Sequence, residues 1–207
     1  STRHRDTLAS PSTEPGDRAF EKDVSSVNDR TTAPDPGTVA LESESASLAR
    51  RIGPSDLTVF PLALSGTVFG WTADGPTTTR ILDRFVELGG TYIDTADSYA
   101  GGRSEIMIGN WMRERGHRDR LTIATKVGKG ADNPGLSARA IERAVEDSLR
   151  RLDVAVIDLL YLHIDDPAVP FDETLLAVDE LIRAGKVRHF GGSDHTGNRL
   201  IEARIAS

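Results

Sequence analysis

The 207-residue sequence contains no cysteine. This absence excludes disulfide bonds, thiolate catalysis and cysteine-based metal sites, and it fits a chain that works in a reducing cytoplasm. Long apolar runs are missing too: none approaches the roughly 20 residues of a membrane-spanning helix, and the N-terminal segment lacks the apolar centre of a signal peptide. We therefore expect a soluble, cytoplasmic protein that does not use a membrane.

Basic residues are in short supply. Lysine and arginine number 25 against 32 aspartates and glutamates, which gives a net charge of −7, and no run of the chain is rich in Lys and Arg. Binding to nucleic acid or to an anionic membrane surface usually needs a clustered positive charge. The composition therefore predicts that neither is the main partner.

Residues 1–45 differ from the rest of the chain. They are rich in Ser, Thr, Pro, Asp and Glu, with isolated apolar residues and no periodicity. Such a segment buries too little apolar surface to offset the entropy of ordering it, so we expect a disordered tail, with a docking or regulatory segment as the alternative. The chain starts at Ser1 rather than Met and stops at Ser207 inside a predicted helix, so we expect a processed, truncated or partial protein.

From residue 46 onward two periodicities alternate. A hairpin is expected first, with its turn at 53–56. Helical spacing follows at 76–90, 104–116, 137–152, 171–185 and 198–207, and strands at 61–66, 91–96, 121–127, 156–163 and 186–193. The strongest helix, 137–152, places Ile141, Val145, Leu149 and Leu152 on one stripe, and Ser104 is the expected N-cap of helix 104–116.

Strict alternation of strand and helix indicates a parallel sheet with right-handed crossovers. A doubly wound nucleotide-binding sheet is one candidate, but its G-x-G-x-x-G signature is absent from PLALSGTVFGW at 61–71. A (β/α)₈ barrel instead predicts polar functional residues after successive strands, which this sequence has. A complete barrel takes about 250 residues. We therefore expect α/β architecture, with 46–207 forming about the first five units of a TIM barrel behind a short hairpin.

Four residues at successive strand ends carry compatible chemistry: Asp94, Tyr99, Lys126 and His163. The carboxyl ends of barrel strands meet on one rim, so these side chains are expected to share a site. An ammonium beside a phenol favours the phenolate, a carboxylate can balance the ammonium, and a neutral imidazole can orient a carbonyl oxygen. Each residue alone has an ordinary structural interpretation as a cap, loop residue, solvated lysine or buried histidine. Together they predict a proton-transfer site.

The segments IDTADSY (93–99), ATKVG (124–128), DLLYLH (158–163) and GKVRHFGGSD (185–194) resemble the aldo-keto reductases. The resemblance covers roughly residues 48–207 in the family's order. It implies that Asp94, Tyr99, Lys126 and His163 form a catalytic tetrad, with Tyr99 as the general acid, Lys126 and Asp94 tuning it, and His163 orienting the carbonyl. It also implies NADPH, less often NADH, as the source of hydride, an aldehyde, ketone or sugar carbonyl as substrate, and no metal. Cofactor contacts are expected at Gly66, Thr67, Ser193 and Asp194.

Two departures from the family pattern bear on function. The family usually has Ser-Asn after its fifth strand, where this chain has Ser193-Asp194; an ionised carboxylate accepts hydrogen bonds but cannot donate them, unlike an amide. The units that would hold the adenine-side phosphate are also absent from the sequence. An alternative hypothesis is therefore a catalytically inactive, truncated relative that binds or regulates. A barrel isomerase or hydrolase fits less well, because such chemistry does not call for this tetrad.

Two charged groups are interpreted as structural. Asp165 and Asp166 follow His163, but no second histidine lies at ligand spacing, so capping or loop roles are expected rather than a metal site. Arg150 and Arg151, with Glu146 and Asp147, are interpreted as a solvated charged helix face.

Overall fold

A computed structural model describes residues 48–206 of the chain. The expected disordered tail, 1–45, lies outside the described residues. No helix in the described part is long and apolar enough to cross a membrane.

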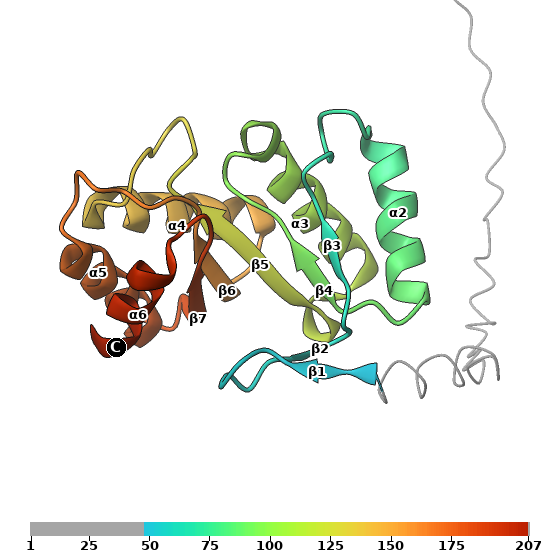
Figure 1. Ribbon diagram of the computed structural model, residues 1–207. Coiled ribbons are helices and arrows are strands. Elements are labelled where there is room, and N and C mark those ends of the chain that lie inside the picture. The colour runs from blue at the N-terminus through green and yellow to red at the C-terminus, as the bar shows by residue number, and fades with distance from the viewer. Residues whose placement is uncertain (1–47, 207) are drawn as a thin grey trace, which may run out of the picture. The chain divides into compact units, whose positions relative to one another are not determined.

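Five parallel strands form the main sheet (Figure 1). They are β3 (Ala63–Ser65), β4 (Tyr92–Asp94), β5 (Thr122–Val127), β6 (Ile157–Leu162) and β7 (Val187–Gly192). Their order in the sheet, β3-β4-β5-β6-β7, is their order in the sequence. Every neighbouring pair is parallel. The strand positions and the parallel sheet expected from the sequence are confirmed.

A helix follows each strand of this sheet, and the first four helices return the chain to the start of the next strand. These helices are α2 (Gly75–Glu87), α3 (Arg103–Arg115), α4 (Ala138–Leu152), α5 (Phe171–Arg183) and α6 (Gly197–Ala206), with short 3₁₀ turns η1 (Tyr99–Gly102) and η2 (Arg118–Arg120). Two of them begin at capping side chains: Asp74 accepts from the Thr77 amide and Ser137 from the Ala140 amide. Such caps satisfy amides that the first helical turn leaves unpaired.

The expected N-cap of α3 is wrong. The helix begins at Arg103, one residue earlier, behind Gly102, whose φ of 83° is left-handed. Ser104 is fully buried inside the helix and donates to the Gly66 carbonyl at 2.8 Å. A turn of consecutive glycines lets the chain enter the helix without a side-chain cap, and the serine hydroxyl instead ties α3 to the loop after β3.

The two faces of the sheet are covered differently. Two apolar clusters fill the space between the strands and the helices, and the stripe predicted for α4, Ile141, Val145, Leu149 and Leu152, is buried in them. A smaller cluster on the opposite face joins Leu57 of the hairpin to Ala124 and Leu159. Helices on one face only, with side chains filling the other, are the arrangement of a barrel wall and not of a doubly wound sheet.

The predicted hairpin is confirmed as β1 (Arg50–Arg51) and β2 (Thr58–Val59). Its Asp56 pairs with Arg188 at 2.8 Å, and Arg188 also contacts Asp158 at 3.1 Å. Asp158, only 5% exposed, takes a second partner, Arg118, at 2.9 Å. A buried carboxylate needs such partners to offset its lost hydration. These ion pairs join the hairpin, η2, β6 and β7 at the amino ends of the strands, which leaves the opposite rim free for chemistry.

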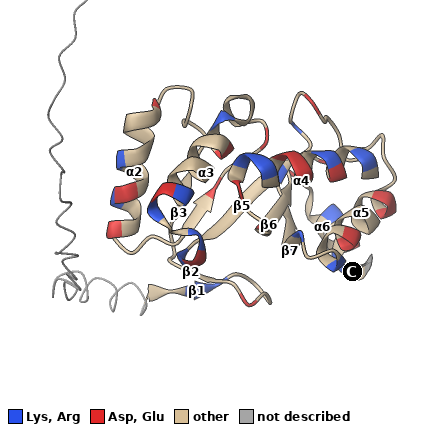
Figure 2. Ribbon diagram, turned by 180° about the vertical axis from the view of Figure 1, so that it is seen from behind, with Lys and Arg blue, Asp and Glu red and all other residues tan. Residues whose placement is uncertain are grey.

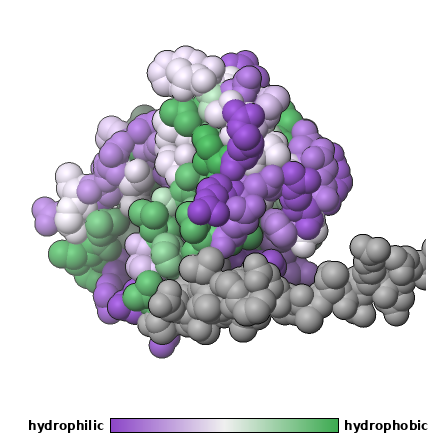
Figure 3. Space-filling view, turned by 90° about the vertical axis from the view of Figure 1, so that its right-hand side faces the viewer, coloured by the Kyte–Doolittle hydropathy of each residue, from purple (hydrophilic) through white to green (hydrophobic). Residues whose placement is uncertain are grey.

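Charge is concentrated on the outer helices. Figure 2 shows basic and acidic residues interspersed along α2 and α4, and mainly acidic residues along α5. From the side of α2, hydrophobic surface is visible between hydrophilic side chains (Figure 3). The exposed apolar residues Leu62 and Val68 flank β3, which hydrogen-bonds only to β4. The charged surface thus follows the outer layer, and exposed apolar residues lie both near β3 and on α5 and α6, among them Leu176 and Ile201.

The contact between α3 and α4 depends on Gly109. A Cβ atom there would lie 2.6 Å from the carbonyl oxygens of Arg151 and Leu152. Alanine is the better helix former by up to about 1 kcal/mol, but this clash is with backbone and overpacking costs about 1–3 kcal/mol. We predict that Gly109→Ala lowers the free energy of unfolding by at least about 1 kcal/mol in urea denaturation. Asn110→Ala on the exposed side of the same helix is the control; equal effects would contradict the prediction.

Candidate active site

Lys126 lies at the centre of the candidate site. Its ammonium donates to Asp94 Oδ2 at 2.6 Å, to the Thr95 carbonyl oxygen at 2.9 Å and to the Tyr99 hydroxyl at 3.1 Å. The residue is 8% exposed. An ammonium has three donors, and here each has a partner, which is what allows a charged lysine to remain buried.

The sheet register brings these residues together. Asp94 is the last residue of β4 and pairs with Ala124 of β5, so Lys126 follows on the same strand, on the same face, toward the rim. The segment after β4 stays bound to β5, because the Asp97 amide donates to the Lys126 carbonyl at 2.9 Å. Tyr99 then opens the 3₁₀ turn η1, which returns its phenol over the lysine.

His163 completes the group from β6. Its amide donates to the Val127 carbonyl at 2.9 Å, and its ring meets Tyr99 edge-to-face, with ring centres 5.9 Å apart. Burial, and then the positive charges of Lys129 and Lys126, lower the pKa of His163 to about 4. The imidazole is therefore neutral at pH 7, and its buried Nδ1 has no hydrogen-bond partner among the described residues.

All four residues predicted for proton transfer thus share one site. The Tyr99 hydroxyl accepts from Lys126, so its own proton is free to be donated to another oxygen. Asp94 balances the ammonium, although burial raises the pKa of its carboxyl above the ordinary value against the opposing effect of Lys126. The Tyr99 phenol accepts a hydrogen bond from Lys126 and lies beside a neutral imidazole. Such a pair is suited to binding a carbonyl oxygen and donating a proton to it.

Ser193 and Asp194, two of the residues predicted to contact a cofactor, lie on the same rim. The Ser193 amide donates to the Leu162 carbonyl at 2.9 Å, which places the residue beside His163 at the end of β7. Asp194 has a left-handed φ of 56°, a conformation that Asp and Asn tolerate better than most residues. Its Oδ2 pairs with Lys129 at 2.8 Å.

The other two, Gly66 and Thr67, lie in the loop after β3. The Gly66 amide donates to the Asp94 carbonyl at 2.7 Å, and its own carbonyl accepts from Ser104. Thr67 is exposed, and its hydroxyl is hydrogen-bonded to Ser65 at 2.7 Å. The polar groups of Gly66 are thus engaged within the protein, whereas Thr67 faces outward.

Two charged residues near the site were not singled out from the sequence. Lys129 follows β5 by two residues and reaches Asp194 on the far side of β6. Asp97 is 7% exposed and has no side-chain hydrogen-bond partner among the described residues; the backbone amides of Gly128 and Gly130 lie beside its carboxylate and favour the charged form. Burial, followed by the charge of Glu105, raises the pKa of Asp97 to about 6. The only signal in the sequence was their closeness to strand ends.

A buried ion pair supports this part of the rim. Glu105, with no exposed surface, pairs with Arg151 at 2.6 Å and accepts from the Thr125 hydroxyl at 2.6 Å. Arg151 is 19% exposed. The interpretation of Arg151 as part of a solvated face is therefore wrong, because its stem points inward from α4 toward α3.

The aspartates after His163 have structural partners. Asp165 pairs with Arg199 of α6 at 3.0 Å, and Asp166 accepts from the Leu136 amide at 2.9 Å. Within the described residues, no group of three or more His, Cys, Asp or Glu side chains is placed to hold a metal ion.

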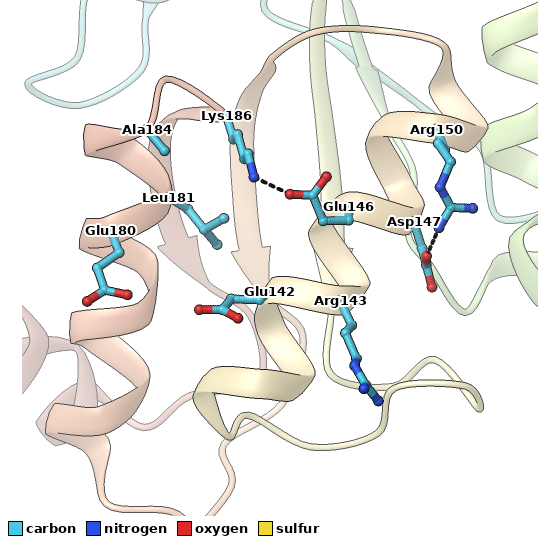
Figure 4. Close-up of a pocket in the computed structure, with 9 residues that line it drawn as sticks. All are labelled: Glu142, Arg143, Glu146, Asp147, Arg150, Glu180, Leu181, Ala184 and Lys186. Carbon is cyan, nitrogen blue, oxygen red and sulfur yellow. Dashed lines mark hydrogen bonds and ion pairs between the residues drawn. The ribbon is translucent and has the colours of Figure 1, made fainter.

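A groove of about 540 Å³ lies between α4 and α5, away from the tetrad (Figure 4). Lys186, which precedes β7, reaches Glu146 across it, and Arg150 contacts Asp147. Asp194 follows the same strand, so the groove and the tetrad lie at opposite ends of β7. The groove is lined by acidic and basic side chains, some of them joined in these ion pairs, as expected of a solvated helix face.

Comparison with known proteins identifies the same family that the sequence motifs resemble. The model of the aldo/keto reductase family matches residues 64–205. Norsolorinic acid reductase B of Aspergillus parasiticus is 34% identical over 70% of this chain and 43% of its own length. A putative aryl-alcohol dehydrogenase of Saccharomyces cerevisiae is 38% identical over 66% of this chain and 41% of its own length. The chain spans about two fifths of the length of such curated relatives.

Solved structures agree on the fold. The holo form of an aldo-keto reductase from Bacillus halodurans matches 77% of this chain and 54% of its own, with a TM-score of 0.70 and 36% identity. A glycerol dehydrogenase from Gluconobacter oxydans matches 78% and 53%, with a TM-score of 0.69 and 28% identity. The predicted partial TIM barrel is confirmed: the sheet and its helices are part of the barrel of this family.

The buried carboxylate of Asp97 gives a prediction on stability. Its folded-state pKa, about 6, lies above the ordinary 3.8. Between these values the folded state binds more protons than the unfolded state, so this group's contribution to stability is lost as pH rises through about 6. We predict that Asp97→Asn raises the free energy of unfolding at pH 7 by about 1–2 kcal/mol. The gain should shrink to nothing near pH 4, as measured by urea denaturation across that range.

The control is Asp119→Asn, at an exposed carboxylate in η2. It should leave the pH dependence of stability as it is in the parent. A gain in Asp97→Asn that is the same at pH 4 and pH 7 would show that the buried charge is not its cause.

Proposed function

We propose that this chain, which belongs to the aldo/keto reductase family, carries the proton-donating half of a nicotinamide-dependent carbonyl reductase. The substrate class is an aldehyde, ketone or sugar carbonyl, reduced to the alcohol. The observation that carries the proposal is the Lys126 ammonium, buried between Asp94 and Tyr99 with His163 beside the phenol. The names of two relatives, a norsolorinic acid reductase and an aryl-alcohol dehydrogenase, add aryl carbonyls to the substrates worth testing.

Each residue has a distinct role in the proposed reaction. Tyr99 donates its proton to the carbonyl oxygen as negative charge develops there, and the Lys126 ammonium stabilises the phenolate that remains. Asp94 keeps the ammonium in place at 2.6 Å. His163 is neutral, so it offers the carbonyl oxygen a hydrogen bond without competing as an acid.

The site residues fit a nicotinamide cofactor, NADPH or alternatively NADH, which supplies hydride when bound. Ser193 and Asp194 are the residues proposed to hold its nicotinamide end, and Thr67 faces outward near the same rim. A cavity of about 480 Å³ lies between β7 and α6; its lining includes Gly192 and His195, the neighbours of Ser193 and Asp194, together with Leu200 and Arg204 of α6. The lack of cysteine fits a cytoplasmic setting for this reaction.

The alternative is a catalytically inactive relative that binds or regulates. What favours it is Asp194, where the family usually has Asn. The assembled tetrad argues for catalysis, because a buried, fully paired lysine is costly to maintain without a use. The two functions differ in one observable, the consumption of reduced cofactor with a carbonyl substrate.

Removing one oxygen atom tests the role of Tyr99. We predict that Tyr99→Phe lowers kcat/KM for NADPH-dependent carbonyl reduction by at least about 100-fold, the usual contribution of a positioned general acid. The assay follows NADPH absorbance with a panel of aliphatic, aryl and sugar carbonyls. Affinity for the cofactor should change little, because the phenol is assigned to the carbonyl and not to the nicotinamide.

Tyr92→Phe is the matched control. Tyr92 lies two residues before Asp94; within the described part of the chain its hydroxyl is hydrogen-bonded to the Tyr161 hydroxyl at 3.2 Å, and its ring packs against the cluster of Leu57, Ala124 and Leu159. The Tyr92→Phe variant also loses a hydroxyl oxygen, but at a position assigned to neither substrate nor cofactor. Its activity should therefore stay within a few-fold of the parent. Equal activity in both variants would overturn the assignment of Tyr99, and a folded parent protein that consumes no NADPH with any carbonyl would favour the inactive relative.

A further inference from the structure

The ion pair between Lys129 and Asp194 bridges the rim above His163. Lys129 comes from the loop after β5 and Asp194 from the loop after β7, while His163 follows β6, the strand between them. Both charges act on His163: Lys129 lowers the pKa of the imidazole and Asp194 raises it. The pair is therefore part of the surroundings of the tetrad, not a remote surface contact.

This ion pair is expected to contribute little to the stability of the fold. Its side chains are 37% and 70% exposed, and ion pairs in such surroundings usually contribute between nothing and about 1 kcal/mol. Unlike the pair Glu105–Arg151, it holds no buried polar group in place. Its distinctive property is its location, beside the nicotinamide position proposed for Ser193 and Asp194.

The pair also combines the hydrogen-bonding abilities of an amide. An asparagine side chain offers a carbonyl oxygen that accepts and an NH₂ group that donates; a carboxylate only accepts, and an ammonium only donates. The 2.8 Å contact uses one oxygen of Asp194 and one N–H of Lys129. A carboxylate has about four acceptor positions and an ammonium three donors, so both functions remain available side by side.

We infer that Lys129 and Asp194 together replace the amide of asparagine in binding the carboxamide of a nicotinamide cofactor. Asp194 accepts a hydrogen bond from the carboxamide NH₂ group, and Lys129 donates one to the carboxamide oxygen. Lys129 is thereby a cofactor-positioning residue, and the aspartate at 194 is compatible with binding because the lysine is there. This inference rests on the proposed function, since it needs a nicotinamide at this rim.

The charges of the pair explain why neither residue would suffice alone. Without Lys129, the Asp194 carboxylate would face the partial negative charge of the carboxamide oxygen with no counter-ion. Without Asp194, the positive charge of Lys129 would have lost its ion-pair partner on a rim that already holds the ammonium of Lys126. Hydrogen bonds that involve a charged group are worth about 1.5–3 kcal/mol, so loss of one corresponds to a tenfold or greater loss of affinity.

The test uses the full chain and measures dissociation constants by fluorescence titration, not turnover. The proteins are the parent, Lys129→Met, Asp194→Asn, Asp194→Ala, and the double variant Lys129→Met/Asp194→Asn. The ligands are NADP⁺ and its 3-acetylpyridine analogue, in which a methyl group replaces the carboxamide NH₂. Methionine matches the length of lysine but has no donor. Arg84→Gln, which removes an exposed ion pair with Glu87 in α2, is the control and should bind as the parent does.

We expect Lys129→Met to bind NADP⁺ at least about tenfold more weakly than the parent. Adding Asp194→Asn to it should recover most of that loss, because the amide again supplies both donor and acceptor. The parent should also prefer NADP⁺ over the analogue by about tenfold, and Asp194→Ala should lose this preference. Recovery in a double variant is the opposite of what two independent structural defects would give.

Three results would overturn the inference. These are unchanged NADP⁺ affinity in Lys129→Met, additive losses in the double variant, and a preference over the analogue that persists in Asp194→Ala. Each of these three results is compatible with the proposed function as long as the parent protein binds the cofactor. A folded parent that binds neither ligand overturns the proposed function itself, and the inference with it.

Discussion

The buried ammonium of Lys126 is the constraint on which this rim depends. A charged lysine that is 8% exposed is stable only if its three donors are satisfied, and the partners come from one strand end, one backbone carbonyl and one 3₁₀ turn. The end of β4, the segment after it and the position of Tyr99 are therefore fixed together. Losing one partner of a buried ion pair typically costs about 3–5 kcal/mol. The geometry of the proposed site and the local structure therefore depend on the same hydrogen bonds.

Along the strands, the structural ion pairs and the proposed site lie at opposite ends. At the amino ends, Asp158 joins Arg118 and Arg188, and the hairpin is fastened there through Asp56. The helices pack their apolar stripes against one face of the sheet. The carboxyl ends remain free to present polar side chains. Because neighbouring parallel strands follow one another in the sequence, the residues at their carboxyl ends lie side by side. This is how Asp94, Lys126 and His163, which are far apart in the sequence, come to lie in one site.

Much of this could be predicted from the sequence, for physical reasons. Buried strands and amphipathic helices carry distinct periods, and Asp94, Tyr99, Lys126 and His163 each stand where a period ends. The remainder depends on tertiary contacts that no local pattern encodes. Ser104 resembles a cap but is drawn into the helix by the Gly66 carbonyl, and Arg151 resembles a surface residue until Glu105 is placed beside it. The bridge from Lys129 to Asp194 joins residues 65 positions apart.

The central claim is that Asp94, Lys126 and Tyr99 act as one unit in reducing a carbonyl. A double-mutant cycle on kcat/KM tests it most directly, with Asp94→Asn, Lys126→Met and the double variant compared with the parent. Residues that act as a unit give strongly non-additive effects. The account predicts that the double variant is scarcely less active than Lys126→Met alone, because Asp94 acts only through the lysine. Losses that multiply, as for independent sites, would contradict it.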